Sequence, residues 1–172
     1  MHDTDPVANA DDPRLESYRN SRWNRKPDAT THDFIVEGRY CVERLLQSDY
    51  EVHSVVIAEG KSVESFERLN RVVPVYSLPP AEIRKLVGFN FHRGIMACAK
   101  RPALKPMAVF EQEITRPQLT IALLGLCERE NVGSIMRTAA ALGVERILLG
   151  PNTADPFARR TIRVSMGTVF RL

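Results

Sequence analysis

The amino-acid sequence predicts an α/β protein made of two units, and three observations lead to this class. Short β-rich runs alternate with amphipathic helical segments over residues 31–100, which is typical of a partly parallel sheet with helices on its faces. The run QLTIALLGL from Gln118 is continuously apolar, as expected of a strand covered on both faces. A helical pattern over 131–143 and a second apolar run, ERILLG, follow. A crossover of this length predicts a parallel pair of strands.

The first unit is expected to contain both strands and helices. FIVEGRYCVERLLQ (34–47) is close to helical spacing for much of its length, and EVHSVVIAEG is typical of a strand that ends at Gly60. SVESFERLN predicts a helix that begins at Ser62, and Pro74 in VVPVYS favours an edge position or a strand end. PPAEIRKLVG predicts a helix between prolines and a capping glycine, and GIMACAK predicts the closing strand.

Three other segments complete the expected organisation. Residues 1–30 have three prolines and almost no apolar periodicity, so they are interpreted as a disordered or extended tail; the alternative for its basic half around Trp23 is an arm that folds onto RNA or the domain surface. Residues 101–117 are interpreted as a linker, with a short helix over 108–114 as the alternative. In the second unit, 118–172, DPFARRTIRVSMG predicts a short basic helix and TVFRL a strand.

The composition excludes several classes of protein. Of the 172 residues, 44% are hydrophobic and 26% charged, which excludes wholesale disorder. The longest apolar run is far short of the ~18–20 residues of a membrane helix. Three widely spaced cysteines form neither a disulfide framework nor a metal-binding knuckle, so we expect no metal and a cytoplasmic, reducing location. A net charge of +3 is too small to establish a polyanionic partner.

The loop from Cys127 to Arg137 is the strongest candidate site, because open α/β sheets bind ligands where a parallel strand leads into a helix. Asn131 is expected to cap the helix, Gly133 to let a ligand approach the backbone, and Arg137 to reach back towards the loop. The alternative is an ordinary cap and a surface arginine. Cys127 is interpreted as a buried small residue rather than a nucleophile, and the nearby acids Glu128 and Glu130 as ion-paired.

Two basic clusters offer candidate nucleic-acid surfaces, with ordinary solvated faces as the alternative. The first lies between Glu82 and Lys105 and contains an aromatic residue and a histidine beside its basic residues. Its members are Arg84, Lys85, Phe91, His92, Arg93, Lys100, Arg101 and Lys105. The second has no acid after Asp155 and consists of Arg159, Arg160, Arg163 and Arg171.

The segment LLGLCERENVGSIMRTAAALGVERILLGP, followed by ADPFARRTIRVSMGTVFRL, resembles the SpoU branch of the knotted RNA methyltransferases. The match to the first motif of that family rests on Asn131, Gly133, Arg137, Ala139 and Gly143, followed by a strand and RVSMG. FIVEGRYCVERLL and HRGIMA resemble the family's small N-terminal substrate-binding domain, a ribosomal-protein-like α/β module that binds RNA. The resemblance covers about Phe34 to Leu172 and implies that residues 118–172 are the first half of a parallel-sheet α/β-knot methyltransferase domain.

The resemblance implies that a homodimeric enzyme transfers a methyl group from S-adenosylmethionine to a ribose 2′-hydroxyl of structured rRNA or tRNA. It gives Arg137 the main catalytic role. Because a guanidinium stays protonated up to pKa values above ~12, we favour clamping of the adjoining phosphate and stabilisation of the forming alkoxide over action as a base. Asn131 would shape the loop and touch the substrate. The resemblance and the basic clusters together predict RNA contacts from Glu37, Gly38, Arg39, His92, Arg93, Gly94, Gly133, Arg159, Arg160 and Arg163.

Two further motifs of this family line the cofactor pocket, and neither is present in residues 1–172. No cofactor-binding residue is therefore assigned, and we expect this stretch to lack most of the cofactor site and to be impaired in activity. Two alternatives stay open: an RNA-binding module without catalysis, and an α/β protein that binds a small anion or nucleotide and is unrelated to RNA.

Overall fold

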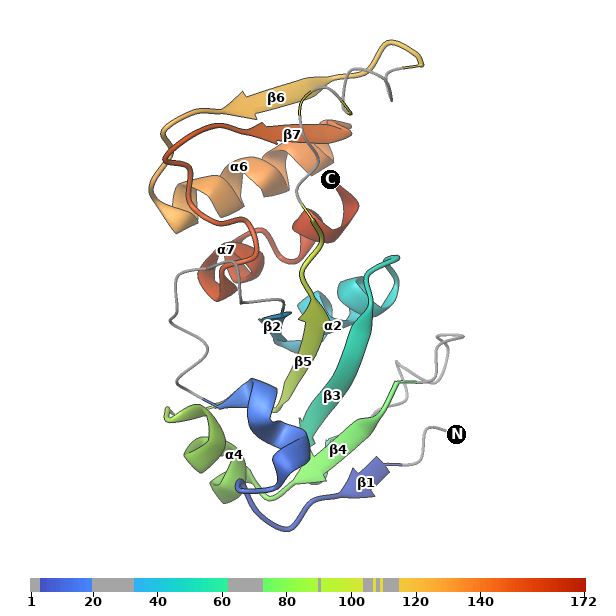
Figure 1. Ribbon diagram of the computed structural model, residues 1–172, viewed down its shortest axis with the longest axis vertical. Helices are drawn as coiled ribbons and strands as arrows, with labels where there is room; N and C mark the ends of the chain where they lie inside the picture. Colours follow the sequence, from blue (N-terminus) through green and yellow to red (C-terminus); the bar gives the residue numbers. More distant parts are fainter. Residues whose placement is uncertain are drawn as a thin grey trace. The chain divides into compact units, whose positions relative to one another are not determined.

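The computed structural model describes residues 4–19, 33–61, 73–89, 91–103 and 115–172, together with the single residues 107 and 109. The chain divides into two units, Met1–Lys100 and Arg101–Leu172 (Figure 1). The helix expected to begin at Ser62, most of the expected 101–117 linker and the basic arm around Trp23 lie outside the described residues. No helix in the described ranges has the length and apolar character needed to cross a membrane.

A five-stranded mixed sheet forms the centre of the first unit. The strands are β1 (Thr4–Pro6), β2 (Asp33–Glu37), β3 (Val52–Ala58), β4 (Val75–Leu78) and β5 (Ile95–Lys100). Their order is β1-β4-β3-β5-β2, in which β1, β4 and β3 run parallel and β5 runs antiparallel to both of its neighbours (Figure 1). The partly parallel α/β sheet predicted from the alternating pattern is therefore confirmed.

The described residues of this unit include the α-helices α2 (Arg39–Leu46) and α4 (Pro80–Val87). Helix α4 has its proline in the first turn and ends at Gly88, whose φ of +77° is left-handed, as the sequence predicts. The helical interpretation of residues 34–47 is wrong for its first half, which is β2. Phe34 and Val36 are buried while Ile35 between them is half-buried, so the period there is two and the helix begins only after Gly38.

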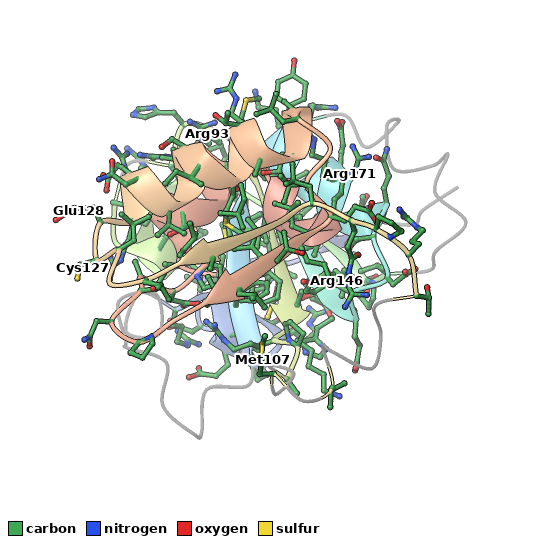
Figure 2. All side chains as sticks on the ribbon, turned by 90° about the horizontal axis from the view of Figure 1, so that it is seen from above. Arg93, Met107, Cys127, Glu128, Arg146 and Arg171 are labelled. Atoms are coloured by element: carbon green, nitrogen blue, oxygen red, sulfur yellow. The ribbon has the colours of Figure 1, made fainter. Side chains whose placement is uncertain are left out.

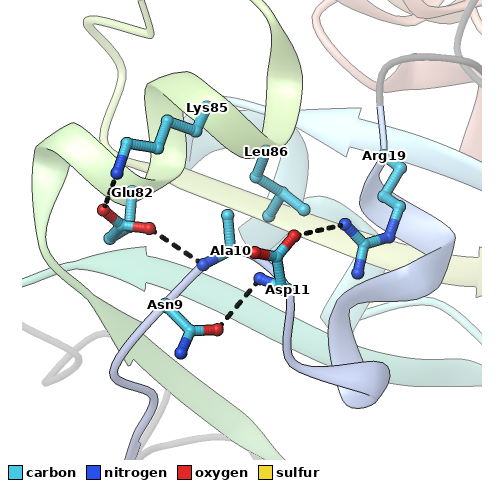
Figure 3. Close-up of a pocket in the computed structure, with 7 residues that line it drawn as sticks. All are labelled: Asn9, Ala10, Asp11, Arg19, Glu82, Lys85 and Leu86. Atoms are coloured by element: carbon cyan, nitrogen blue, oxygen red, sulfur yellow. Dashed lines mark hydrogen bonds and ion pairs between the residues drawn. The ribbon is translucent and has the colours of Figure 1, made fainter.

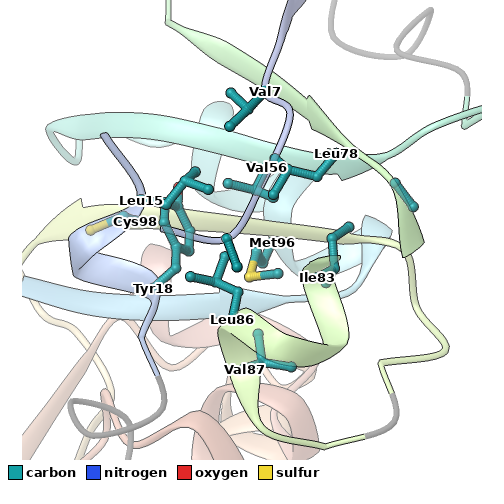
Figure 4. Packing of buried hydrophobic residues seen from close by; sticks show 12 residues of the cluster. Val7, Leu15, Tyr18, Val56, Leu78, Ile83, Leu86, Val87, Met96 and Cys98 are labelled. Carbon is teal, nitrogen blue, oxygen red and sulfur yellow. The ribbon is translucent and has the colours of Figure 1, made fainter. Parts of the chain in front are cut away.

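Residues 4–19 are part of the first unit, so the expected tail is wrong over this range. β1 adds an edge strand to β4, and a 3₁₀ helix, η1 (Pro13–Tyr18), follows. Leu15 and Tyr18 are 0% exposed (Figure 4), and the Tyr18 hydroxyl donates a hydrogen bond of 2.8 Å to the Ser54 carbonyl. Four apolar side chains without regular spacing anchor the segment: Val7, Ala10, Leu15 and Tyr18. Such isolated anchors leave no periodic signal in the sequence.

The second unit contains β6 (Thr120–Leu123), α6 (Arg129–Ala141), β7 (Arg146–Leu149), α7 (Arg159–Val164) and a final 3₁₀ helix, η2 (Thr168–Arg171). β6 and β7 are parallel, and α6 is followed by Gly143 with a φ of +78°, both as predicted. Two expectations are wrong. β6 is not covered on both faces, since Ala122 is exposed. The C-terminal segment is η2 instead of a strand, because Gly167 turns left-handed and buries Val169 and Phe170.

Candidate functional site

The loop between β6 and α6 is largely open to solvent. Residues 124–131 are exposed except for the half-buried Leu126. Cys127 and Glu128 point outward where α6 begins (Figure 2), and the Cys127 thiol donates to the Asn152 carbonyl at 3.2 Å. The interpretation of Cys127 as a buried residue is therefore wrong, while Cys41 and Cys98 in the first unit are buried.

Asn131 does not cap α6, which corrects the sequence-based assignment. The helix begins three residues earlier than expected, with Glu128 as the N-cap residue and a hydrogen bond of 3.1 Å from the Val132 N–H to the Glu128 carbonyl. Asn131 lies in the first turn with its side chain exposed, and its carbonyl accepts a 3.0 Å hydrogen bond from the Ser134 hydroxyl. A charged residue at the N-cap without a side-chain cap bond leaves no sequence signal that marks this start.

The space beside Gly133 is filled by other residues of the protein, so it is not open to a ligand. A Cβ added there would lie 2.8 Å from the Thr161 carbonyl oxygen and 2.9 Å from Cβ of Val164. Both contacts come from α7, and real Cβ atoms do not come this close to backbone. The glycine therefore lets α6 and α7 pack with their backbones in near contact, and direct contact of Gly133 with RNA is not supported.

Arg137 is exposed on α6 and forms no hydrogen bond or ion pair with any residue that the structure describes. It follows Gly133 by one turn, so it lies beside the row that packs on α7. Asn131 lies six residues earlier, about 9 Å along the helix axis and about a third of a turn around it. The two predicted catalytic residues thus share a helix but not a face.

The basic helix α7 contributes Arg159, Arg160 and Arg163, as predicted, but Arg160 is already paired. Its Nε donates to Oε1 of Glu130 at 2.7 Å, which joins the start of α7 to the start of α6. The Arg160 guanidinium, by this hydrogen bond first, lowers the pKa of the Glu130 carboxyl. The expectation that Glu130 is ion-paired is confirmed. Arg159 and Arg163 are half-buried and also have interactions within the protein.

An ion pair that was not predicted from the sequence, here called the clasp, holds the loop ahead of α7. The guanidinium of Arg101 binds both carboxylate oxygens of Asp155, at 2.7 and 2.9 Å, and lies 5.3 Å from the ring centre of Phe157. Asp155 also accepts a 3.0 Å bond from the Phe157 N–H. Because 54 residues separate the partners, no local pattern pairs them. Because Arg101 is bound to Asp155, it does not belong to the predicted basic RNA-binding surface of residues 82–105.

In the first unit the structure brings together two short segments predicted to contact RNA, Glu37–Arg39 and His92–Gly94. β2 ends where β5 begins, with Glu37 opposite Met96, and the Gly38 N–H donates to the Ile95 carbonyl at 3.0 Å. This pairing places the two segments at the same end of the sheet, although more than 50 residues separate them in the sequence. Arg39 lies 3.9 Å from Glu43 on the next turn of α2.

The remaining basic residues of the 82–105 cluster do not form one surface. Lys85 binds Glu82 at 2.6 Å on α4, and Lys100 binds Glu51 at 2.9 Å. Arg93 and Lys100 flank opposite ends of β5, so roughly 20 Å of strand separates them. Lys105 lies outside the described residues. The solvated-face interpretation therefore holds for Lys85 and Lys100, and Arg93 stands apart from them.

An open pocket of about 430 Å³ lies in the first unit, between the N-terminal segment and α4 (Figure 3). The charged side chains that line it are paired within the protein, Glu82 with Lys85 and Arg19 with Asp11 at 3.5 Å. Glu82 also accepts a hydrogen bond of 3.0 Å from the Ala10 N–H. These contacts fasten the N-terminal segment to α4. The pocket therefore serves docking of the N-terminal segment, and it lies in the unit that does not contain Asn131 and Arg137.

Comparison with known proteins supports the resemblance noted in the sequence. Residues 118–172 match the SpoU rRNA Methylase family. An uncharacterized tRNA/rRNA methyltransferase of Mycobacterium bovis is 33% identical over 169 residues, which are 96% of this chain and 58% of that protein. The 23S rRNA (guanosine(2553)-2'-O)-methyltransferase RlmP of Bacillus subtilis is 24% identical over 166 residues, 92% of this chain and 63% of that protein.

Solved structures agree with the fold over both units. The crystal structure of an RNA 2'-O ribose methyltransferase is similar with a TM-score of 0.71 and 26% identity, over 97% of this chain and 63% of that one. AviRb, a SpoU methyltransferase of Streptomyces viridochromogenes solved in complex with AdoMet, gives a TM-score of 0.74 at 20% identity, over 93% of this chain and 60% of that one, and so supports the fold alone. The chain spans about three fifths of the length of these relatives. Residues 118–172 thus match the SpoU domain, and the chain as a whole is similar to RNA methyltransferases of the SpoU/TrmH family.

Proposed function

We propose that this chain belongs to an enzyme that methylates a ribose 2′-hydroxyl in structured rRNA or tRNA. The observation that carries the proposal is the agreement between the SpoU match at 118–172 and the position of Arg137, an exposed arginine with no partner among the described residues. A guanidinium in this state is available for the phosphate beside the target ribose, because planar N–H groups bind phosphate in pairs.

Arg137 is proposed to clamp that phosphate and to stabilise the oxyanion that forms as the 2′-hydroxyl loses its proton. A guanidinium offers five N–H donors and no acceptor, so no role as the base is assigned to it. Asn131, a third of a turn away, is proposed to touch the RNA from the loop side, and Arg159 and Arg163 to supply positive charge on α7. Arg160 joins them only if RNA competes with Glu130 for its guanidinium.

S-adenosylmethionine is the proposed methyl donor, as the bound AdoMet in relatives suggests. The described residues do not fit an enclosed cofactor site. Residues 124–131 are mostly exposed, and the pocket described above lies in the other unit. We assign no residue of this chain to cofactor binding. A homodimer is proposed on the family resemblance alone, and a cytoplasmic location on the three widely spaced cysteines.

The proposal is tested by disrupting the gene in its host, where the protein is made at its natural length. Disrupting it should remove one 2′-O-methyl group from rRNA or tRNA in the host, detected as a new site of alkaline cleavage. The wild-type gene should restore the methyl group, and Arg137→Ala should not. Arg116→Ala is the matched control, because that exposed arginine is already bound to Glu145 at 2.9 and 2.6 Å. Unchanged methylation after disruption would refute the proposal.

A further inference from the structure

Glu37 and Arg93 meet where β2 ends and the loop enters β5. Nε of Arg93 lies 4.0 Å from Oε1 of Glu37, and the two side chains differ sharply in exposure, at 53% and 3%. A distance of 4.0 Å is too long for a hydrogen bond, so the attraction is one between charges. A carboxylate as buried as Glu37 cannot touch RNA, and its charge would repel a phosphate. The earlier expectation that Glu37 itself contacts RNA therefore does not suit its position.

Gly38 lies directly beneath the Arg93 side chain. A Cβ added at Gly38 would lie 3.1 Å from Cδ and 3.2 Å from Nη1 of Arg93, and the glycine has a left-handed φ of +90°. Any larger residue would therefore have to move the arginine as well as strain the backbone. Gly38 leaves room for Arg93 to run across the start of α2 with its guanidinium half in solvent.

The charges of Arg93 and Glu37 both lie close enough to the buried Cys41 thiol in α2 to affect it. Burial raises the pKa of the thiol to about 11, and the Arg93 charge opposes that rise while the Glu37 charge adds to it. Arg93 and Glu37 thus attract one another, and both influence the pKa of the Cys41 thiol. The Arg93 guanidinium therefore lies close to both the Glu37 carboxylate and the Cys41 thiol at this end of α2.

We propose that Arg93 is the RNA phosphate-binding residue of the first unit, and that Glu37 and Gly38 are positioning residues that hold its guanidinium in place. The inference rests on the proposed RNA function and refines it, because it separates the group that touches RNA from the groups that order it. An arginine that is already held loses less conformational freedom on binding, so the affinity for RNA rises.

The sign of one substitution distinguishes this inference from general electrostatics. Glu37→Gln removes a negative charge, so long-range attraction alone would strengthen the binding of an RNA polyanion. If Glu37 acts by holding Arg93, the same change weakens binding instead. A purely structural Glu37 would change the melting temperature without altering how RNA affinity depends on Arg93.

The experiment measures fluorescence anisotropy of a labelled, unmodified tRNA transcript with the 172-residue chain over a series of salt concentrations. Arg93→Ala should weaken binding about tenfold at low salt and make the log–log salt dependence shallower by about 0.9. Glu37→Gln should weaken binding by about threefold when Arg93 is present. In the Arg93→Ala background, the same substitution should cause no additional loss. Lys100→Ala, at the other end of β5 and paired with Glu51, is the control and should change little.

A second measurement does not depend on RNA. In the ¹⁵N NMR spectrum, the Arg93 Nε–H signal should shift and lose order in Glu37→Gln, while amide signals of β2 and β5 stay in place. If the wild-type chain shows no salt-dependent binding to tRNA or to an rRNA hairpin, the proposed RNA function of this unit fails. If it binds and Arg93→Ala weakens it, but Glu37→Gln strengthens binding or adds independently, only the positioning role is overturned.

Discussion

The two units use their sheets in opposite ways. In the first unit β3 and β5 form the middle of the core, and five of the six residues of β5 are buried. In the second unit every residue of β7 is only half-buried, and Leu124 just after β6 is 74% exposed. The buried side chains there belong mainly to α6, α7 and η2. Stability therefore depends on the interior of the sheet in one unit and on close contact between helices in the other.

The largest effect is expected where the N-terminal segment enters the first core. Tyr18→Ala should lower the free energy of unfolding by about 3–5 kcal/mol, because it leaves a cavity beside Ser54 and Cys98. Urea unfolding followed by circular dichroism measures this. Tyr40→Ala is the control, since that tyrosine is exposed and its loss should stay within about 0.5 kcal/mol. Equal effects of the two substitutions would show that residues 4–19 are not part of the core.

In the second unit, Gly133→Ala tests whether helix contact carries the stability. Alanine normally stabilises a helix interior by about 1 kcal/mol relative to glycine. Here the added Cβ would meet the Thr161 carbonyl at 2.8 Å, so we expect a loss of about 1–3 kcal/mol instead. Ser134→Ala, on the exposed side of α6, should be nearly neutral. A stabilised Gly133→Ala variant would contradict the close approach of α6 and α7.

The clasp before α7 offers a comparison of two arginines within the second unit. Arg101 and Asp155 are mostly buried, whereas Arg116 and Glu145 form a similar two-bond pair in solvent. Arg101→Ala should cost about 1–3 kcal/mol because it leaves a poorly hydrated carboxylate. Arg116→Ala should cost about 0–1 kcal/mol. Thermal unfolding of both variants measures the difference, and equal shifts in melting temperature would mean that burial of the clasp contributes nothing.

The sequence predicted features that are encoded locally. Gly88 and Gly143 end their helices as expected, and the apolar runs at 120–123 and 146–149 form the parallel pair. Gly133 shows the limit: the sequence predicts that a ligand approaches this glycine, whereas α7 makes the close approach, and residue type does not distinguish the two. The start of α6 was missed because Glu128 offers no capping side-chain bond.

Features that depend on distant partners could not be predicted. Tyr18 is buried because Ser54 and the sheet receive it, and nothing near Tyr18 in the sequence signals this. The neighbouring ends of β2 and β5 bring Gly38 and Arg93 together only after the sheet has formed. For both sites, residue type indicated the chemistry, while the fold determined which atoms meet.

The smallest effect is expected at the surface of the N-terminal segment, where Asp12 caps η1. The hydrogen bond from the Arg14 side chain, and then that from its backbone N–H, lower the pKa of Asp12 from 3.8 to about 2. The ionised carboxylate therefore stabilises the folded state above pH about 4, and this contribution is lost as the pH falls towards about 2. Asp12→Asn should be less stable than the wild type at pH 6, with the difference vanishing near pH 2 in urea unfolding. The difference should also shrink in an Arg14→Gln background. Equal stability of the two proteins at both pH values would show that Asp12 acts only as a neutral cap, a role that asparagine also fills.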